Sequence, residues 1–241
     1  MTAAPAATST PGTPGPGSVV VWCARLDPPA AEVSRLARLL DDDERRRADR
    51  FIVPEARRRY VVAHASLRLV LARALSCDAR EVRFGRASCR GCGRPHGKPH
   101  LMPPSALRFN LSHAGDMALV AVAEREVGVD VELVRAGFPV EPMARHHFTR
   151  RERLHVAGMP AGQRDRAFFG VWARKEAVLK AAGDGLTRPL TDVPVPVSGD
   201  GDVTLGPVTW RVVSLAFGER CVGAVAAQGG DWWAQTVRVP A

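Results

Sequence analysis

The sequence predicts an α+β fold of two similar lobes, residues 19–124 and 125–241, and three observations support this. The chain of 241 residues is long enough for two compact halves, each with its own core. Its apolar content of 46% and charged content of 24% are ordinary for a globular protein. In each half, segments with helical periodicity precede a group of short strands, as in α+β folds. No internal sequence repeat is visible, so the order of elements alone predicts that the lobes are similar.

The first half follows an uncharged tail, residues 1–18, which we expect to be disordered because it cannot bury enough apolar surface. The acidic run at 41–43 suits a helix N-terminus, and Pro54 is well placed to open a long amphipathic helix. The apolar runs predict strands. The elements expected here are strands at 19–23, 81–84, 107–111 and 117–123, and helices at 30–40, 42–51 and 54–75.

The second half begins near Glu126 and is expected to end with strands that close the fold. Gly128 should let the backbone pass close either to a ligand or to a neighbouring helix. Trp172 is expected to anchor a long helix in the core, and Gly183 should end that helix. The elements expected here are strands at 128–133, 204–205, 210–216, 221–227 and 235–239, and helices at 142–148, 150–156 and 165–182.

The strand at 128–133 and the helix at 165–182 supply acidic side chains that can share a metal ion. Side chains two apart on a strand point to the same face, so Asp130 and Glu132 can converge. Glu176 and Lys180 are four apart and share one face of a helix. Mg²⁺ prefers a few carboxylate oxygens, completed by water and substrate phosphates. The alternative is two solvent-facing acids on a half-exposed strand and a surface ion pair on the helix.

A third motif, Phe109-Asn-Leu-Ser-His113, is expected to form the turn that leads into the strand at 117–123. At such a turn, Ser112 and His113 can offer a hydroxyl, backbone amides and an imidazole to a phosphate. Taken separately, His113 is more often a structural histidine, and Lys98 upstream a solvated loop lysine. The conjunction of the three motifs favours a site for a diphosphate and its metal.

In order along the chain, five motifs resemble those of the 4'-phosphopantetheinyl transferases. The resemblance covers residues 45–190 and is to the larger, monomeric Sfp-like type that activates peptide and polyketide synthetases. It implies two α+β lobes related by a pseudo-twofold axis, with the active site in the cleft between them. The motifs are Gly97-Lys98-Pro99, Phe109-Asn-Leu-Ser-His113, Gly128-Val-Asp-Val-Glu132, Phe148-Thr149 and Trp172-x-x-Lys-Glu-Ala-x-x-Lys180.

Carried over residue by residue, the resemblance makes Asp130, Glu132 and Glu176 the ligands of Mg²⁺, with Mn²⁺ as an alternative. It makes Lys180 a contact to the diphosphate of coenzyme A and, with Glu176, one of two catalytic residues. Arg47 is chosen to grip the 3'-phosphate from a basic stretch, 44–50, that is otherwise a solvated helix face. The coenzyme-contacting positions expected from the resemblance and its neighbouring loop are Arg47, Arg94, Lys98, Asn110, Ser112, His113, Lys175 and Lys180.

The resemblance implies transfer of the 4'-phosphopantetheine arm of coenzyme A to a serine of an apo acyl or peptidyl carrier protein, with release of adenosine 3',5'-bisphosphate. Glu176 is the implied general base, directly or through a metal-bound water, with Lys175 and His113 as alternatives. Polyketide, peptide and fatty-acid carriers are all compatible with the sequence. Two other classes stay open: a catalytically silent module that binds coenzyme A or carrier proteins, and a basic nucleic-acid-binding protein.

The net charge of +9 indicates a polyanionic partner. Nucleic acid fits this charge as well as coenzyme A with an acidic carrier protein does. Because no motif resembles a nucleic-acid-binding signature, we expect no nucleic-acid partner. No stretch is long and apolar enough to cross a bilayer, and the N-terminus does not resemble a secretory signal. We therefore expect a cytoplasmic protein without a membrane partner, and the resemblance implies a monomer.

Five cysteines, an odd number, fit a reducing compartment. Cys89 and Cys92 have the CxxC spacing of half a zinc site, which His96 or His100 could complete. A structural zinc site usually has a second, separated pair of ligands, so we do not expect zinc at this pair. The alternative is a glycine-rich loop whose backbone approaches the adenine end of the coenzyme, with Arg94 nearby.

Overall fold

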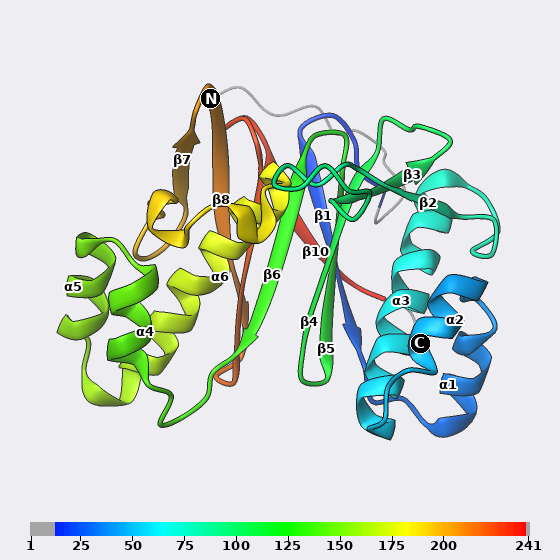
Figure 1. The fold of residues 1–241 in the computed structure, drawn as a ribbon, viewed down its shortest axis with the longest axis horizontal. Helices are drawn as coiled ribbons and strands as arrows, with labels where there is room; N and C mark the ends of the chain where they lie inside the picture. Colours follow the sequence, from blue (N-terminus) through cyan, green and yellow to red (C-terminus); the bar gives the residue numbers. More distant parts are fainter. Residues whose placement is uncertain (1–12, 240–241) are drawn as a thin grey trace, which may run out of the picture.

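The computed structural model of the chain describes residues 13–239, apart from the side chain of Leu186, and shows two α+β lobes (Figure 1). Each lobe has its own four-stranded sheet and one long helix. The α+β class with two similar lobes is confirmed. Residues 1–12 of the predicted disordered tail lie outside the described residues. The end of that tail is ordered, because Ser18 already begins the first strand.

The N-terminal lobe places its long helix, α3, across one face of its sheet. Leu67 and Leu71 of α3 pack there against Val20, Val120 and Val122. The strand order of the sheet is β10-β1-β5-β4, and β2 and β3 form a separate pair. The elements are β1 (Ser18–Arg25), α1 (Ala30–Ala37), α2 (Asp42–Ala48), α3 (Pro54–Leu75), β2 (Arg83–Arg86), β3 (Pro99–Met102), β4 (Arg108–Ala114) and β5 (Met117–Ala123).

The C-terminal lobe repeats this plan, with α6 across a sheet of order β6-β9-β8-β7. Trp172 of α6 is partly buried and packs against the core, with its ring centroid 5.7 Å from that of Phe168. Gly183 ends α6 in the left-handed region, at φ 75°. The elements are β6 (Val127–Leu133), α4 (Val140–His147), α5 (Arg150–Gly158), α6 (Arg164–Ala182), β7 (Gly201–Leu205), β8 (Val208–Phe217), β9 (Cys221–Gln228) and β10 (Trp233–Arg238).

The last strand, β10, returns to the sheet of the N-terminal lobe. It runs parallel to β1, with Val19 opposite Ala234, and it forms the edge of that sheet. The N-terminal sheet is therefore completed by residues that follow the whole C-terminal lobe along the chain.

The two lobes meet through the sheet faces that their long helices leave uncovered. Val19 and Val21 of β1 share one buried cluster with Val127, Val129 and Val131 of β6. The helices consequently lie on the outside and the two sheets in the middle (Figure 1). Because side chains alternate along a strand, the residues between these valines, Asp130 among them, face the opposite side, toward α6.

Side chains of β4 join the edges of the two sheets. The Asn110 side-chain oxygen accepts a hydrogen bond from Val129 N at 2.9 Å, and the Ser112 hydroxyl accepts a longer one, at 3.4 Å, from Val131 N. The motif expected to form a turn is therefore a strand, since β4 continues to Ala114 and its backbone pairs with β5. The turn itself comes later, at Gly115, where φ is +54°. The sequence analysis also missed β3, a short strand that begins with a proline.

Candidate active site

A buried cluster at the junction of the lobes links Ser112 of β4, Asp130 of β6 and Lys180 of α6. The Ser112 hydroxyl donates to Asp130 Oδ1 at 2.9 Å. The Lys180 ammonium donates to the same oxygen at 2.6 Å and to the Ser112 hydroxyl at 3.1 Å. Side chains from three motifs that are far apart in the sequence thus meet at one carboxylate oxygen.

Gly128 explains why Lys180 reaches Asp130. A Cβ atom at this position would lie 2.2 Å from Ala177 O and 2.3 Å from Ala181 N, so α6 rests directly on the backbone of β6. Of the two roles expected for this glycine, the structure supports the approach of the neighbouring helix. This contact fixes the position of α6, and with it Lys180, relative to Asp130.

Glu132 and Glu176 complete an acidic group around Asp130. Burial raises the pKa of Asp130, opposed by the charge of Lys180. Burial, together with the charge of Asp130, raises the pKa of Glu132 to about 7. Burial and then the charge of Asp130 also raise the pKa of Glu176. Each carboxylate is therefore held in a place where its negative charge is unfavourable unless a cation balances it.

The donor set of this group fits a hard divalent cation. Asp130 Oδ2 is buried and has no hydrogen-bond partner in the described structure, which is rare for a buried polar atom. Hard cations such as Mg²⁺ take carboxylate oxygens of this kind. The oxygens of Asp130, Glu132 and Glu176 do not all lie within 4.8 Å of one another, since among the described residues only a cysteine and histidine group does so. Cation binding would require Glu132 and Glu176, which are only partly buried, to turn inward.

Two residues expected to contact coenzyme are used to hold the lobes together. The Lys98 ammonium donates to Glu126 Oε2 at 2.7 Å, to Val127 O at 3.0 Å and to Ala181 O at 2.9 Å. Because an ammonium has three N–H donors, none is left for a phosphate. The side-chain oxygen of Asn110 is likewise occupied by the backbone of β6. Both side chains therefore link the lobes at the junction, and their contact with coenzyme stays a prediction.

Lys175, which was expected to contact coenzyme or to contribute as a base, is buried within the C-terminal lobe. Its side chain is fully buried, with Nζ 2.8 Å from Glu152 Oε2. It also donates to the carbonyls of Leu190 and Val193, at 2.9 and 2.7 Å. The residue adjacent to Glu176 therefore points into the C-terminal lobe, because consecutive positions on a helix face different directions.

Arg47 and His64 of α3 both contact the ring of Tyr60 in the N-terminal lobe. Burial, followed by the fields of His64 and Lys180, lowers the pKa of His113. His64 stacks on Tyr60 at 4.1 Å between ring centroids, and the Arg47 guanidinium lies 5.8 Å from the centre of the same Tyr60 ring. The sequence analysis missed His64, although its position four residues after Tyr60 places both rings on one face of α3.

The remaining predicted residues are placed as follows. Arg45 and Arg46 pair with Asp42 and Asp43 within α2, whereas Arg47 has no carboxylate partner in the described part of the chain. The backbone carbonyl of Arg94 accepts a hydrogen bond from Cys89 N, and no contact in residues 13–239 links its guanidinium to the carboxylates. Arg94 therefore stays outside the cluster.

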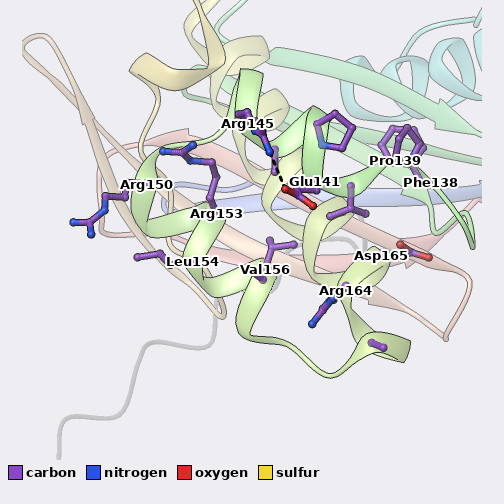
Figure 2. Close-up of a pocket in the computed structure, with 15 residues that line it drawn as sticks. Phe138, Pro139, Glu141, Arg145, Arg150, Arg153, Leu154, Val156, Arg164 and Asp165 are labelled. Atoms are coloured by element: carbon purple, nitrogen blue, oxygen red, sulfur yellow. Dashed lines mark hydrogen bonds and ion pairs between the residues drawn. The ribbon is translucent and has the colours of Figure 1, made fainter.

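A separate cavity of about 710 Å³ lies between α4, α5 and the start of α6 (Figure 2). Arginines and apolar side chains such as Val156 line it. One of these arginines, Arg145, pairs with Glu141 at 2.8 Å. None of the residues predicted to bind metal or coenzyme lines it. The basic residues that line it are Arg145, Arg150, Arg153 and Arg164.

Comparison with known proteins assigns both lobes to one family. Residues 126–225 match the 4'-phosphopantetheinyl transferase superfamily, and residues 24–125 match the N-terminal domain of 4'-phosphopantetheinyl transferases. The 4'-phosphopantetheinyl transferase HetI of Nostoc sp. (strain PCC 7120) is 35% identical over 89% of both chains. The 4'-phosphopantetheinyl transferase Sfp of Bacillus subtilis (strain 168) is 25% identical over 72% of this chain and 74% of its own. Among the described residues, no helix is long and apolar enough to cross a membrane.

Proposed function

Since this chain belongs to the 4'-phosphopantetheinyl transferase superfamily, we propose that it transfers the phosphopantetheine arm of coenzyme A to a serine of an apo carrier protein. The observation that carries the proposal is the meeting of Asp130, Ser112 and Lys180 at the junction of the lobes, with Asp130 Oδ2 buried and unpartnered beside them. A silent binding module would have no need to keep an unpaired buried carboxylate oxygen, which destabilises the fold.

We propose that Asp130, Glu132 and Glu176 hold the divalent cation of the reaction, Mg²⁺ or Mn²⁺. When bound, the cation supplies positive charge next to the diphosphate oxygens of coenzyme A. The raised pKa values of the three carboxylates support this assignment, because neighbouring negative charges that repel one another are the groups that a divalent cation stabilises.

The transfer forms a bond between the carrier serine oxygen and the phosphorus that bears the pantetheine arm. It breaks the bond from that phosphorus to the bridging diphosphate oxygen, and adenosine 3',5'-bisphosphate leaves. Lys180 counters the negative charge that grows on the leaving oxygen. Glu176 is the proposed general base that takes the serine proton. Ser112 keeps the Lys180 ammonium directed at the cleft.

The nucleotide end of the coenzyme is proposed to lie along α2 and α3. Arg47, His64 and His113 offer positive charge or hydrogen-bond donors on that side of the cleft, and Tyr60 connects the first two. A phosphate placed there would meet a guanidinium that has no carboxylate partner among the described residues. This supports Arg47 as a contact to the 3'-phosphate.

The arginine-lined cavity of the C-terminal lobe is proposed to meet the acidic surface of the carrier protein. It is formed by α4, the first helix after β6, so it lies on the lobe that supplies the three carboxylates. Its arginines and the net charge of +9 support an anionic partner.

The deciding experiment incubates the protein with coenzyme A, Mg²⁺ and a panel of apo carrier proteins, followed by mass spectrometry of each carrier. We expect one carrier or more to gain the phosphopantetheine mass, with equal release of adenosine 3',5'-bisphosphate. A carrier whose acceptor serine is replaced by alanine is the control, and a chelator of Mg²⁺ should stop the gain. Binding of coenzyme A without transfer to any carrier would favour the silent module. A salt-dependent shift of DNA or RNA without turnover would favour the nucleic-acid alternative.

A further inference from the structure

The loop between β2 and β3, residues 87–98, brings together three metal-binding side chains that the proposed transfer does not use. The ligand atoms of Cys89, Cys92 and His96 all lie within 4.8 Å of one another. Cys92 Sγ lies 3.0 Å from His96 Nε2. Within residues 13–239, this is the only group of three or more histidine, cysteine or acidic residues with that spacing.

Backbone hydrogen bonds close the loop around the two cysteines. Cys89 N donates to Arg94 O at 2.7 Å, and Gly93 N donates back to Cys89 O at 2.8 Å. Gly93 has φ +71°, a conformation that suits glycine and directs the chain out of the tight turn after Cys92.

We propose that Cys89, Cys92 and His96 bind one Zn²⁺ ion. Zinc takes sulfur at about 2.3 Å and imidazole nitrogen at about 2.0–2.1 Å in a tetrahedron, which sets its ligands about 3.5–4 Å apart. Small side-chain movements bring the three ligand atoms to that spacing. Two thiolates balance the charge of the ion, so binding adds no net charge to a loop that also carries Arg90 and Arg94.

The fourth position of the tetrahedron is open to water or to an external ligand. His100, the other histidine considered for the site, lies in β3 opposite Gly85. Its imidazole covers the space above Gly85 that a side chain there would fill. No fourth histidine, cysteine or acidic side chain joins the group within the described chain.

A bound ion would make this loop rigid where it contacts the C-terminal lobe. Arg90 pairs with the buried Asp184 at 2.6 Å, and a Cβ atom at Gly91 would lie 2.8 Å from Thr187 Cγ2. At the end of the loop, Lys98 binds Ala181 O, next to Lys180 on α6. The segment from Cys89 to His96 thus contacts the residues just after α6 through Arg90 and Gly91, and Lys98, two residues beyond it, contacts the end of α6 itself. A bound ion would restrict the motion of these contacts.

The test uses the purified full chain, reduced and freed of metal. Titration with Co²⁺ should give the absorption bands of a tetrahedral ion with thiolate ligands at one equivalent per chain, and Zn²⁺ should remove them stoichiometrically. Hydrogen exchange of residues 87–98 and 183–188 should slow when Zn²⁺ is added. Absence of thiolate-to-cobalt bands from the reduced wild-type chain would overturn the proposal, and so would a Cys89–Cys92 disulfide that forms equally well with Zn²⁺ present.

Variants identify the ligands. Cys89→Ser with Cys92→Ser should lose the bound ion, while Cys77→Ser, a cysteine of the same lobe outside the loop, should keep one equivalent. His96→Ala should weaken zinc binding, and His100→Ala should leave it unchanged. Equal zinc content in Cys89→Ser/Cys92→Ser and in Cys77→Ser would show that the metal binds elsewhere. The wild-type cobalt spectrum decides the question even if a variant fails to fold.

Discussion

The two lobes share one buried feature, an ion pair between the long helix and a short helix, but they differ in the residues next to it. Each long helix buries one cation completely, Arg68 in α3 and Lys175 in α6. Each cation pairs with a glutamate of a capping box at the start of a short helix: Arg68 with Glu44 at 2.6 Å, and Lys175 with Glu152 at 2.8 Å. Buried charges persist only when they are paired and hydrogen-bonded, so these pairs fix each short helix against its long one.

The match extends to the backbone. Arg68 donates to the carbonyls of Ala79 and Val82, in the segment that follows α3. Lys175 donates to two carbonyls in the segment that follows α6. The two lobes therefore repeat one arrangement, in which a buried cation of the long helix binds a capping-box glutamate and two backbone carbonyls. The residue type of the cation differs between the lobes. This shared arrangement supports the pseudo-twofold relation between the lobes.

The difference lies in the positions that follow the buried cation. One and five residues after it, α3 has Leu69 and Arg73, whereas α6 has Glu176 and Lys180. The buried positions are shared by both lobes, whereas Glu176 and Lys180, the residues proposed to act in the reaction, occur only on α6. In the proposed site, the structural and the reacting residues therefore occupy different faces of one helix and can be changed separately.

The largest expected effect is a loss of turnover when Glu176 or Lys180 of α6 is replaced. Glu176→Ala and Lys180→Ala should each lower the rate of phosphopantetheine transfer by about 10²–10³-fold or more, because each removes charge stabilisation at the reacting groups. Leu69→Ala and Arg73→Ala, the matched positions of α3, should stay close to wild type. The measurement is carrier mass gain per unit time at saturating coenzyme A. Wild-type turnover by Glu176→Ala would remove Glu176 from the proposed site.

The buried pairs should respond equally in both lobes. Lys175→Met leaves the buried Glu152 carboxylate without its cation, and Arg68→Met leaves Glu44 with His64 as its remaining side-chain partner, so each should lower the free energy of unfolding by about 3–5 kcal/mol. Denaturant unfolding measures this. The folded fraction of Lys175→Met should still transfer the arm, because Lys175 does not face the cleft. A folded but inactive Lys175→Met would restore Lys175 to the active site.

Gly128→Ala tests whether the contact of β6 with α6 positions the site. The added methyl meets backbone atoms of α6, so we expect a loss of about 1–3 kcal/mol in stability. Turnover should also fall, because Lys180 and Asp130 would separate. Gly158→Ala is the control, since nothing lies within 4 Å of a Cβ atom there. Wild-type stability and turnover in Gly128→Ala would contradict the close packing.

A smaller effect is expected from pH, through Glu132 of the C-terminal lobe. The raised pKa of Glu132, about 7, means that the unfolded chain releases this proton at lower pH than the folded chain does. Stability without metal should therefore fall as pH rises from about 4.5 to about 7, and Mg²⁺ should restore it above that range. Thermal melting at several pH values with and without Mg²⁺ measures this. Glu132→Gln should flatten the dependence, and an unchanged slope in that variant would refute the cause.

The smallest expected effect concerns the arginine-lined cavity. Arg150→Glu with Arg153→Glu should raise the KM for the carrier protein and leave the kcat nearly unchanged, because these residues are proposed to attract the partner and not to act on the phosphate. Steady-state kinetics at two salt concentrations would show it. A lower kcat at an unchanged KM would argue against a docking role.

Much of this arrangement could be predicted from local sequence. The bounds of α3 follow from Pro54 and a long apolar stripe, and β5 is an unbroken apolar run; both match the predicted ranges. The facing of Asp130 and Glu132 follows from strand alternation, which the buried valines of β6 bear out. These features depend on neighbouring residues, so the sequence alone contains them.

The rest depends on contacts between distant segments. Lys98, Asn110 and Lys175 have the chemistry of ligand-binding residues, and no local pattern predicts the partners that they have within the fold. The parallel pairing of β10 with β1 joins the two ends of the chain, and no local pattern reports it. The extension of β4 through Ser112 depends likewise on its pairing with β5.

The return of β10 to β1 sets an order of events during synthesis. On the ribosome, the first lobe emerges with one flank of its sheet uncovered, and it stays so until translation reaches the final strand. A premature stop near the C-terminus would therefore damage the half of the protein that is made first.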